Sequence, residues 1–196
     1  MAGVINPEKI YGGDWKDGEA YALDVHTVSS AFVGYDEYGH PQFHTEYSSI
    51  GKLLHNLKYN NDTRMADEIV ALALPRLTNW RKNFSIVVPA PFSKPRKIQP
   101  VFLLAEKIAK ALGKSYRADL LENTSKVQSK EQGGKKIVEI KATKNENISD
   151  NVLLVDDIFD TGKTLIECVK VLKGWYKVNT VYVLCITKTK NKIIRI

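Results

Sequence analysis

The first 47 residues of this 196-residue chain are rich in aromatic, β-branched and turn-forming side chains. Within them, residues 21–33 and 42–47 have the composition that is typical of strands. The intervening residues 36–39 have the sequence Asp-Glu-Tyr-Gly, which favours a tight turn. We therefore expect a β-hairpin in this region.

A helical period follows the hairpin. Apolar residues at 50, 53, 54 and 57 have the spacing of one helix face, and Ser48 and Ser49 precede them as candidate caps. Asp62 is expected to cap a second helix, and Pro75 should kink or end that helix because proline lacks the N–H that a helix interior needs.

From residue 85 onward, apolar runs alternate with helical patterns. Strands are expected at 85–88, 116–121, 151–155 and 178–186, with a short one at 137–140. Helices are expected from Pro100 to Gly113 and from Leu165 to Gly174. The polar residues 122–147 interrupt this order, and a segment of that length inside a compact pattern predicts a mobile lid.

Strands that alternate with helices and carry unbroken apolar runs predict a parallel sheet covered on both faces. The expected fold class is α/β, a doubly wound and mainly parallel sheet. Residues 85–196 would form this core, and residues 1–84 would form an N-terminal cap of a β-hairpin and two helices.

Composition and charge narrow the class of protein. No apolar run approaches the roughly 18 residues of a membrane span, and residues 1–19 lack the pattern of a signal peptide. Two cysteines, Cys168 and Cys185, are too few for a disulfide framework, so a cytoplasmic location is expected. The net charge is +7, and residues 85–196 hold 21 basic against 11 acidic residues. That surplus suits a solvated surface, an anionic substrate or a nucleic acid.

One segment carries candidate chemistry. Residues 152–164 have the sequence Val-Leu-Leu-Val-Asp-Asp-Ile-Phe-Asp-Thr-Gly-Lys-Thr, in which an apolar strand leads to Asp156 and Asp157 and then to the start of a helix. Ligands of open α/β sheets bind at such strand ends, and the free N–H groups of a helix N-terminus suit a phosphate. Carboxylates beside a phosphate site indicate a sugar phosphate as ligand.

Two similar motifs do not fit. Gly162-Lys163-Thr164 matches the end of a Walker A loop, but the glycine required five residues earlier is Asp157. The acidic pair also resembles the pocket of a receiver domain, which would place it after the first strand of the domain rather than near its end.

Residues 152–164 resemble the signature of type I phosphoribosyltransferases: an apolar strand, two acidic residues and a Thr-Gly-x-Thr phosphate loop. Within that group, the chain is most similar to the ComF family of competence-associated (amido)phosphoribosyltransferases. Three stretches support this, namely Leu57-Lys58-Tyr59 with Asp62 downstream, Val88 to Lys94, and Leu103-Leu104-Ala105.

The resemblance implies roles for individual residues. Asp156 and Asp157 would hold the ribose hydroxyls of 5-phosphoribosyl 1-pyrophosphate (PRPP), and would contact its Mg²⁺ ion directly or indirectly. The 5′-phosphate would bind to Asp160, Thr161, Gly162, Lys163 and Thr164. The pyrophosphate would bind to Ala90, Pro91, Phe92, Ser93, Lys94 and Arg96. Residues 122–136 would close over the site, with Lys126, Gln128 and Lys130 as their polar candidates.

The chain departs from the ComF pattern in three places. Its first 167 residues contain no cysteine, so the N-terminal zinc module is missing, and His26, His40, His44 and His55 have no recognisable ligand spacing. After the pyrophosphate loop only Arg96 of the family's Arg-Gly-Phe-Asn-Gln stretch remains. The expected closing loop is rich in Lys, Gln and Gly where the family usually has arginine.

These features predict a Mg²⁺-dependent transferase of nucleotide metabolism that passes the 5-phosphoribosyl group to a nitrogen acceptor and releases pyrophosphate. The acceptor is a nucleobase or an amine, and the sequence does not identify which. Trp15, Tyr35, Phe43 and Tyr47 are candidates to stack on a base or to pack the hairpin. Two alternatives remain: a PRPP or nucleotide sensor without turnover, and an accessory protein of DNA uptake that binds nucleic acid through its basic second half, including Lys188, Lys190, Lys192 and Arg195. A homodimer is compatible with the resemblance.

Overall fold

The computed structural model describes residues 5–15, 19–127 and 136–190. Its centre is a six-stranded sheet with the order β1-β2-β12-β11-β5-β6, and every neighbouring pair is parallel except β1 with β2. These strands are β1 Glu8–Lys9, β2 Ala20–Val25, β5 Ile86–Pro89, β6 Ser115–Tyr116, β11 Val152–Phe159 and β12 Val181–Lys188. The prediction of an α/β fold around a mainly parallel sheet is confirmed.

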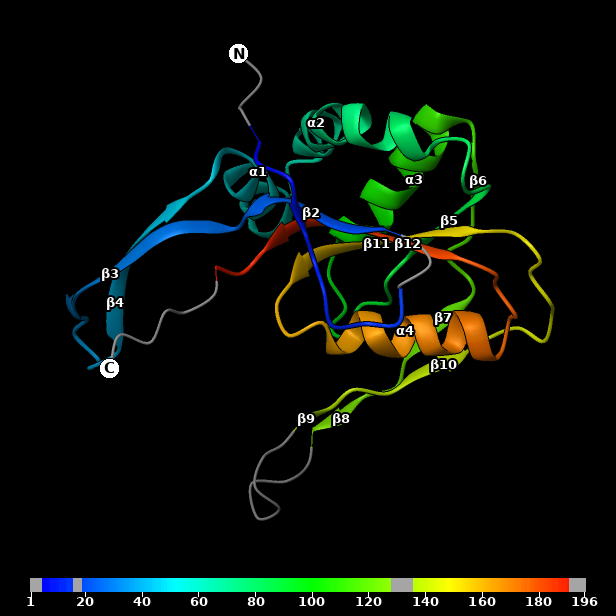
Figure 1. The fold of residues 1–196 in the computed structure, drawn as a ribbon. Helices are drawn as coiled ribbons and strands as arrows, with labels where there is room; N and C mark the ends of the chain where they lie inside the picture. The colour runs from blue at the N-terminus through cyan, green and yellow to red at the C-terminus, as the bar shows by residue number, and fades with distance from the viewer. Residues whose placement is uncertain (1–4, 16–18, 128–135, 191–196) are drawn as a thin grey trace.

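Helices cover both faces of this sheet (Figure 1). On one face lie α1 Ser49–Tyr59, α2 Arg64–Trp80 and α3 Pro100–Leu112, and on the other lies α4 Lys163–Gly174. The sequence of β11 explains the two layers, because successive side chains of a strand point to opposite faces. Leu153 and Val155 pack among the residues of α1 to α3, whereas Val152 and Leu154 pack among those of α4.

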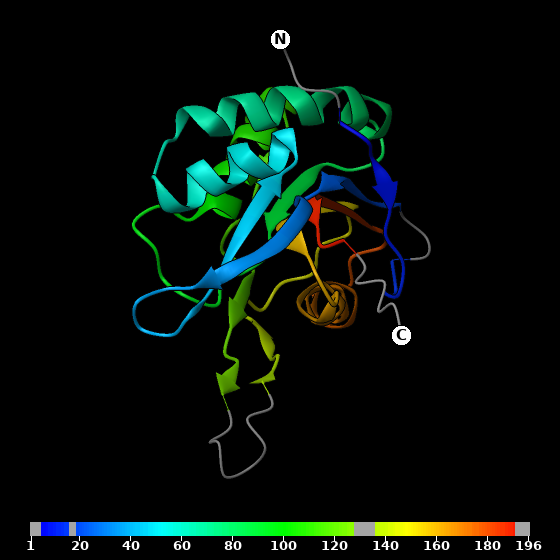
Figure 2. The same ribbon diagram turned by 90° about the vertical axis from the view of Figure 1, so that its left-hand side faces the viewer.

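Two ribbons project from the body in different directions (Figures 1 and 2). The first is the predicted hairpin, formed by β3 Thr27–Tyr35 and β4 Pro41–Tyr47. At its turn the Asp36 N–H donates to the His40 carbonyl, and the His40 N–H donates to the Asp36 carboxylate. The second extends from the α4 side and contains β7 Leu121–Asn123, β8 Lys126–Val127, β9 Lys136–Ile137 and β10 Ile140–Ala142. The polar segment predicted as a lid is therefore built largely as a hairpin.

The residues expected to begin and end helices do so at both ends of α3 and at the start of α1. Ser48 caps α1 by accepting a hydrogen bond of 3.0 Å from the Gly51 N–H, and α3 begins at Pro100 and ends at Gly113, which has the left-handed φ of 65°. Gly51 also permits a close approach, because a Cβ there would lie 2.1 Å from the carbonyl oxygen of His26. Ser48 and Gly51 thus fix the start of α1 against the end of β2.

Two predicted elements differ in detail from the structure. Pro75 does not end α2 but lies inside it, and both Pro75 and Ala71, whose carbonyl loses its helical partner, are exposed to water. The predicted strand 116–121 is two strands, β6 and β7, in different sheets. The chain turns between them where the Arg117 guanidinium donates two hydrogen bonds, of 2.8 and 3.2 Å, to the Asp119 carboxylate.

The proposed division at residue 84 has no counterpart in the sheet. β2, from the N-terminal part, lies between β1 and β12, and its Leu23 packs with α1, α2 and α3 in the same apolar cluster. Residues from both parts of the chain therefore build one layered body. Among the described residues, each helix is too short or too polar to cross a bilayer.

Candidate functional site

Two adjoining cavities lie where β5 and β11 end at the edge of the sheet. The first has a volume of about 250 Å³ and the second about 310 Å³. Three residues, Asp156, Ile158 and Thr164, line both. The carboxyl ends of parallel strands are where open α/β sheets bind ligands, so the position agrees with the expectation from the sequence.

The first cavity collects the residues predicted for a pyrophosphate. All six of them line it, and the remaining lining comes from Lys58, Gln99, Pro100, Val101, Asn123, Asp156, Asp157, Ile158 and Thr164. The loop after β5 is held at both ends. The Ala90 N–H donates to the Val155 carbonyl at 2.8 Å, and the Gln99 side-chain amide donates to the Lys94 carbonyl at 3.2 Å. Lys94 and Arg96 thereby give this cavity two cations on a tethered loop.

The second cavity collects the residues predicted for the 5′-phosphate. Asp160, Thr161, Gly162, Lys163 and Thr164 all line it, together with Val138 of the long hairpin. Gly162 is the N-cap of α4 with a φ of 74°, and no side chain caps the helix. The first N–H groups of α4 are therefore open toward the loop, and the positive end of the helix dipole favours an anion there.

The two adjacent aspartates lie within β11 rather than after it. Pairing with β12 continues to Phe159, so Asp156 and Asp157 are held in the strand and point to its opposite faces. Asp156 accepts a hydrogen bond of 2.8 Å from the Asp157 N–H. Desolvation, and next the charge of Asp157, raise the pKa of the Asp156 carboxyl to about 8. The pair is therefore not two equivalent carboxylates.

Asp156 and Asp157 differ in their contact with Lys58. Its Nζ lies 2.7 Å from Oδ2 of Asp157, and its side chain is only 12% exposed. Within the described ranges, Asp156 takes part in no salt bridge. The sequence analysis quoted Lys58 as part of a family-like stretch but gave it no role. The signal was present: a lysine directly after Leu57, on the buried face of an amphipathic helix.

The long hairpin borders both cavities. Asn123 of β7 lines the first, and Val138 lines the second. Of the predicted closing residues, Lys126 begins β8, whereas Gln128 and Lys130 lie outside the described residues.

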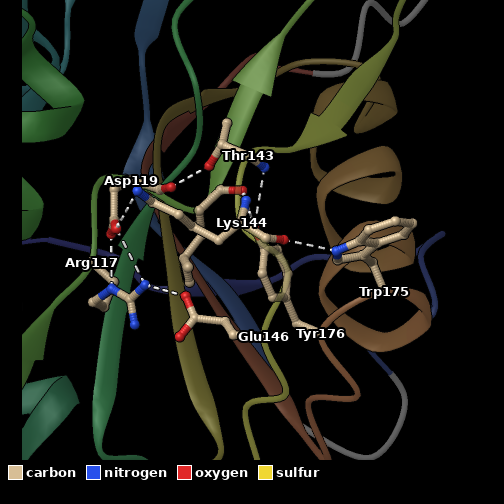
Figure 3. A network of polar contacts seen from close by, with 8 residues as sticks. Arg117, Asp119, Thr143, Lys144, Glu146, Trp175 and Tyr176 are labelled. Carbon is tan, nitrogen blue, oxygen red and sulfur yellow. Dashed lines mark hydrogen bonds and ion pairs between the residues drawn. The ribbon is translucent and has the colours of Figure 1, made fainter.

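A polar network fixes the base of this hairpin to the end of α4 (Figure 3). The buried Tyr176 hydroxyl donates to the Leu120 carbonyl at 2.7 Å and accepts from the N–H groups of Thr143 and Lys144, each at 3.1 Å. The Thr143 hydroxyl donates to the Asp119 carbonyl, and the Trp175 ring N–H donates to the Lys144 carbonyl at 2.8 Å. The hairpin therefore starts from an anchored base beside the cavities.

The histidines and aromatic residues considered earlier have mixed positions. In the part of the chain that the structure describes, no three His, Cys, Asp or Glu side chains cluster as metal ligands. Trp15 is buried and donates to the Ile10 carbonyl, while Phe43 packs against Phe32 on the projecting hairpin. Tyr47 packs edge-on against His26 and at a tilt against His55, whose ring centroids lie 5.4 and 4.9 Å away.

Lys188 and Lys190, which were candidates for binding nucleic acid, make contacts within the fold. Lys188 pairs with Glu8 at 2.6 Å, and Lys190 donates to the Val28 carbonyl at 3.2 Å. Lys192 and Arg195 lie outside the described residues.

Comparison with protein families identifies part of the chain. Residues 102–190 match the family described as the phosphoribosyl transferase domain. The match includes Asp156, Asp157 and the phosphate loop, but neither Lys58 nor the loop 90–96. Residues 102–190 are thus similar to a phosphoribosyl transferase domain, and this similarity supports the predicted PRPP-dependent phosphoribosyltransferase. Comparison with the curated proteins found no match.

Solved structures that match this chain include three phosphoribosyltransferases. The purine enzyme from Pyrococcus horikoshii Ot3 is 16% identical over 62% of this chain and 71% of its own, with a TM-score of 0.45. The adenine enzyme from Saccharomyces cerevisiae, solved with an imino-altritol bisphosphate and adenine, is 11% identical over 82% and 85%, with a TM-score of 0.49. The hypoxanthine enzyme from Staphylococcus aureus is 16% identical over 65% and 66%, with a TM-score of 0.46.

Proposed function

We propose that this protein binds PRPP with Mg²⁺ across the two adjoining cavities and transfers the 5-phosphoribosyl group to a nitrogen acceptor, releasing pyrophosphate. One observation carries the proposal. Two loops that are about 70 residues apart, each expected from the sequence to hold one end of PRPP, line neighbouring cavities that share Asp156 and Thr164. A ligand with a phosphate at one end and a diphosphate at the other matches this arrangement.

The ribose of that ligand would lie over the shared residues. Asp156 and Asp157 offer carboxylate oxygens, which accept hydrogen bonds from ribose hydroxyls. The N-terminus of α4 with Thr161, Gly162 and Thr164 would hold the 5′-phosphate. Anchoring this end supplies orientation at the reacting carbon rather than chemistry.

The residues present fit a Mg²⁺ ion that arrives with the diphosphate. Mg²⁺ keeps several waters and takes one or two protein carboxylates together with phosphate oxygens, so it needs no cluster of three ligands. Asp156, which lines both cavities without a salt bridge to another described residue, and Asp157 are the candidates. When bound, the ion would neutralise charge on the leaving diphosphate.

The remaining chemistry follows from charges already in the cavity. The transition state carries positive charge on the ribose ring, which Asp157 favours, as does Asp156 once its proton has left. The negative charge on the departing pyrophosphate is favoured by Lys94 and Arg96. Water has to be excluded because hydrolysis of PRPP competes with transfer, and the anchored hairpin beside both cavities is the element placed to do so.

We also propose that the chain is related to the ComF family. The family-like stretch Leu57-Lys58-Tyr59 supports this relation, because its Lys58 lines the first cavity. The acceptor is a nucleobase or an amine.

The test is calorimetry with Mg-PRPP on the wild type and on the variant Asp156→Asn with Asp157→Asn. Loss of binding in the variant is expected, and unchanged binding overturns the proposal. Asp150→Asn is the matched control, because Asp150 is exposed just before β11. A pyrophosphate-release assay across bases and amines follows. Binding of Mg-PRPP without release for every acceptor supports a sensor in place of an enzyme.

A further inference from the structure

Lys58 is a nearly buried cation in a cavity otherwise bounded by the strand ends and the loop after β5. It comes from α1, whose start is fixed by the Ser48 cap and by the close approach of Gly51 to His26. Its side chain is 12% exposed, and it lines the first cavity together with Lys94 and Arg96. A lysine is rarely buried to this degree unless its charge is used.

The hydrogen-bonding capacity of Lys58 is only partly used within the protein. An ammonium group has three donors. Its salt-bridge partner is Oδ2 of Asp157 at 2.7 Å, which can occupy one donor, and no other acceptor among the described residues is paired with this nitrogen. Two donors therefore remain for a ligand in the cavity.

The charges of the cavity indicate which part of a ligand these donors would meet. Lys58 and Asp157 compensate each other, whereas Lys94 and Arg96 have no carboxylate within ion-pair distance in the described part of the chain. The side of the cavity that holds Ser93, Lys94 and Arg96 is therefore suited to an anion of more than one negative charge. A diphosphate has that charge and enough oxygens to reach cations on two separate elements.

Resting on the proposed function, we infer that Lys58 completes the diphosphate-binding subsite. Its ion pair with Asp157 holds the side chain in place, and its remaining donors bind a diphosphate oxygen. The helix α1 then contributes to ligand binding directly, in addition to the loop 90–96 and the strand β11.

The experiment compares two probes that represent the two ends of PRPP: inorganic pyrophosphate with Mg²⁺, and ribose 5-phosphate. Affinities are measured by calorimetry for the wild type, Lys58→Met, Lys58→Arg and the control Lys52→Met. Lys52 lies on the same helix with its side chain exposed and outside both cavities. Lys58→Met should weaken pyrophosphate binding by about tenfold or more, the usual effect of losing a charge-assisted hydrogen bond. Ribose 5-phosphate binding should change by less than about threefold. Lys58→Arg should restore part of the loss, and Lys52→Met should change neither affinity.

A second comparison separates direct binding from an effect through Asp157. In an Asp157→Asn background, Lys58→Met should still weaken pyrophosphate binding, because the lost donor contacted the ligand. If its effect disappears there, or if both probes lose affinity equally, Lys58 only orients Asp157 and the inference is overturned. If the wild type binds neither Mg-PRPP nor the probes, the proposed function itself is wrong. If the wild type binds Mg-PRPP and Lys58→Met retains full pyrophosphate affinity, this inference alone is wrong.

Discussion

The substitution Asp156→Asn should make the unliganded protein more stable above neutral pH, although it removes a group that the proposed ligand needs. Desolvation by the surrounding strands, and next repulsion from Asp157, raise the pKa of this carboxyl from 3.8 to about 8. The folded state therefore holds a proton that the unfolded chain has already released. For such an acid, stability is present at low pH and is lost as the pH rises toward the folded-state pKa.

The size of the effect follows from the shift. Between about pH 5.5 and about pH 8.5 the unfolded carboxyl stays ionised while the folded one loses its proton, which at 1.36 kcal/mol per pKa unit corresponds to at most about 3 kcal/mol. The side chain borders two cavities at the surface of the protein, and access of solvent to them screens part of the penalty. We expect the free energy of unfolding of the wild type to fall by about 1–3 kcal/mol relative to the variant over this range.

Urea unfolding at both pH values, followed by circular dichroism without ligand, measures this difference. Groups that titrate equally in both proteins cancel, so the change in the gap between them reports on Asp156 together with its electrostatic interaction with Asp157. Asp150→Asn makes the same chemical change at an exposed position and should leave the gap constant. A gap that does not widen as the pH rises would refute the assignment of a desolvated, proton-holding carboxyl to Asp156.

Three further substitutions test the elements around the site. Tyr176→Phe removes the acceptor of two backbone N–H groups and the donor to a carbonyl, and should cost about 2–4 kcal/mol in thermal or urea unfolding; a loss below about 0.5 kcal/mol would contradict the anchoring role of this hydroxyl. Gly51→Ala places a Cβ 2.1 Å from the His26 carbonyl oxygen and should cost about 1–3 kcal/mol, with an unchanged melting temperature as the opposing result. Gly162→Ala places a Cβ 2.9 Å from the Phe159 ring at a residue with the left-handed φ of 74°, and should weaken ribose 5-phosphate binding. Gly174→Ala is the control and should leave this binding unchanged, because its Cβ would meet open space.

Local patterns predicted the parts of the fold that depend on neighbours in sequence. The apolar run before Asp156, the serine cap of α1 and the glycine end of α3 each act within a few residues, and each appears as expected. The position of β2 beside β12 was missed because it depends on pairing between residues more than 150 positions apart, for which a single sequence holds no signal.

The sequence predicted those residues of the candidate site that lie in the two loops. The residues of both phosphate-type loops are consecutive in the chain, so a motif can describe them, and the fold brings the two loops together. Lys58 lies about 100 residues before its partner Asp157, and only the packing of α1 on the sheet joins them. The inequality of the two aspartates was hidden for the same reason, since it is created by groups distant in sequence.

The continuation of β11 through both aspartates has a consequence for how the protein responds to a ligand. Asp156 pairs with Cys185 of β12, and Asp157 lies between two paired residues of a strand whose pairing continues to Phe159, so the sheet restrains the backbone of both. The groups around them come from α1, the loop after β5, the start of α4 and the long hairpin, which lie on different layers. A molecule bound at this edge would contact elements of both helix layers and of the sheet, and would therefore restrain their movement relative to one another. Its presence should therefore slow hydrogen exchange on both sides of the sheet, including the helix layer opposite α4.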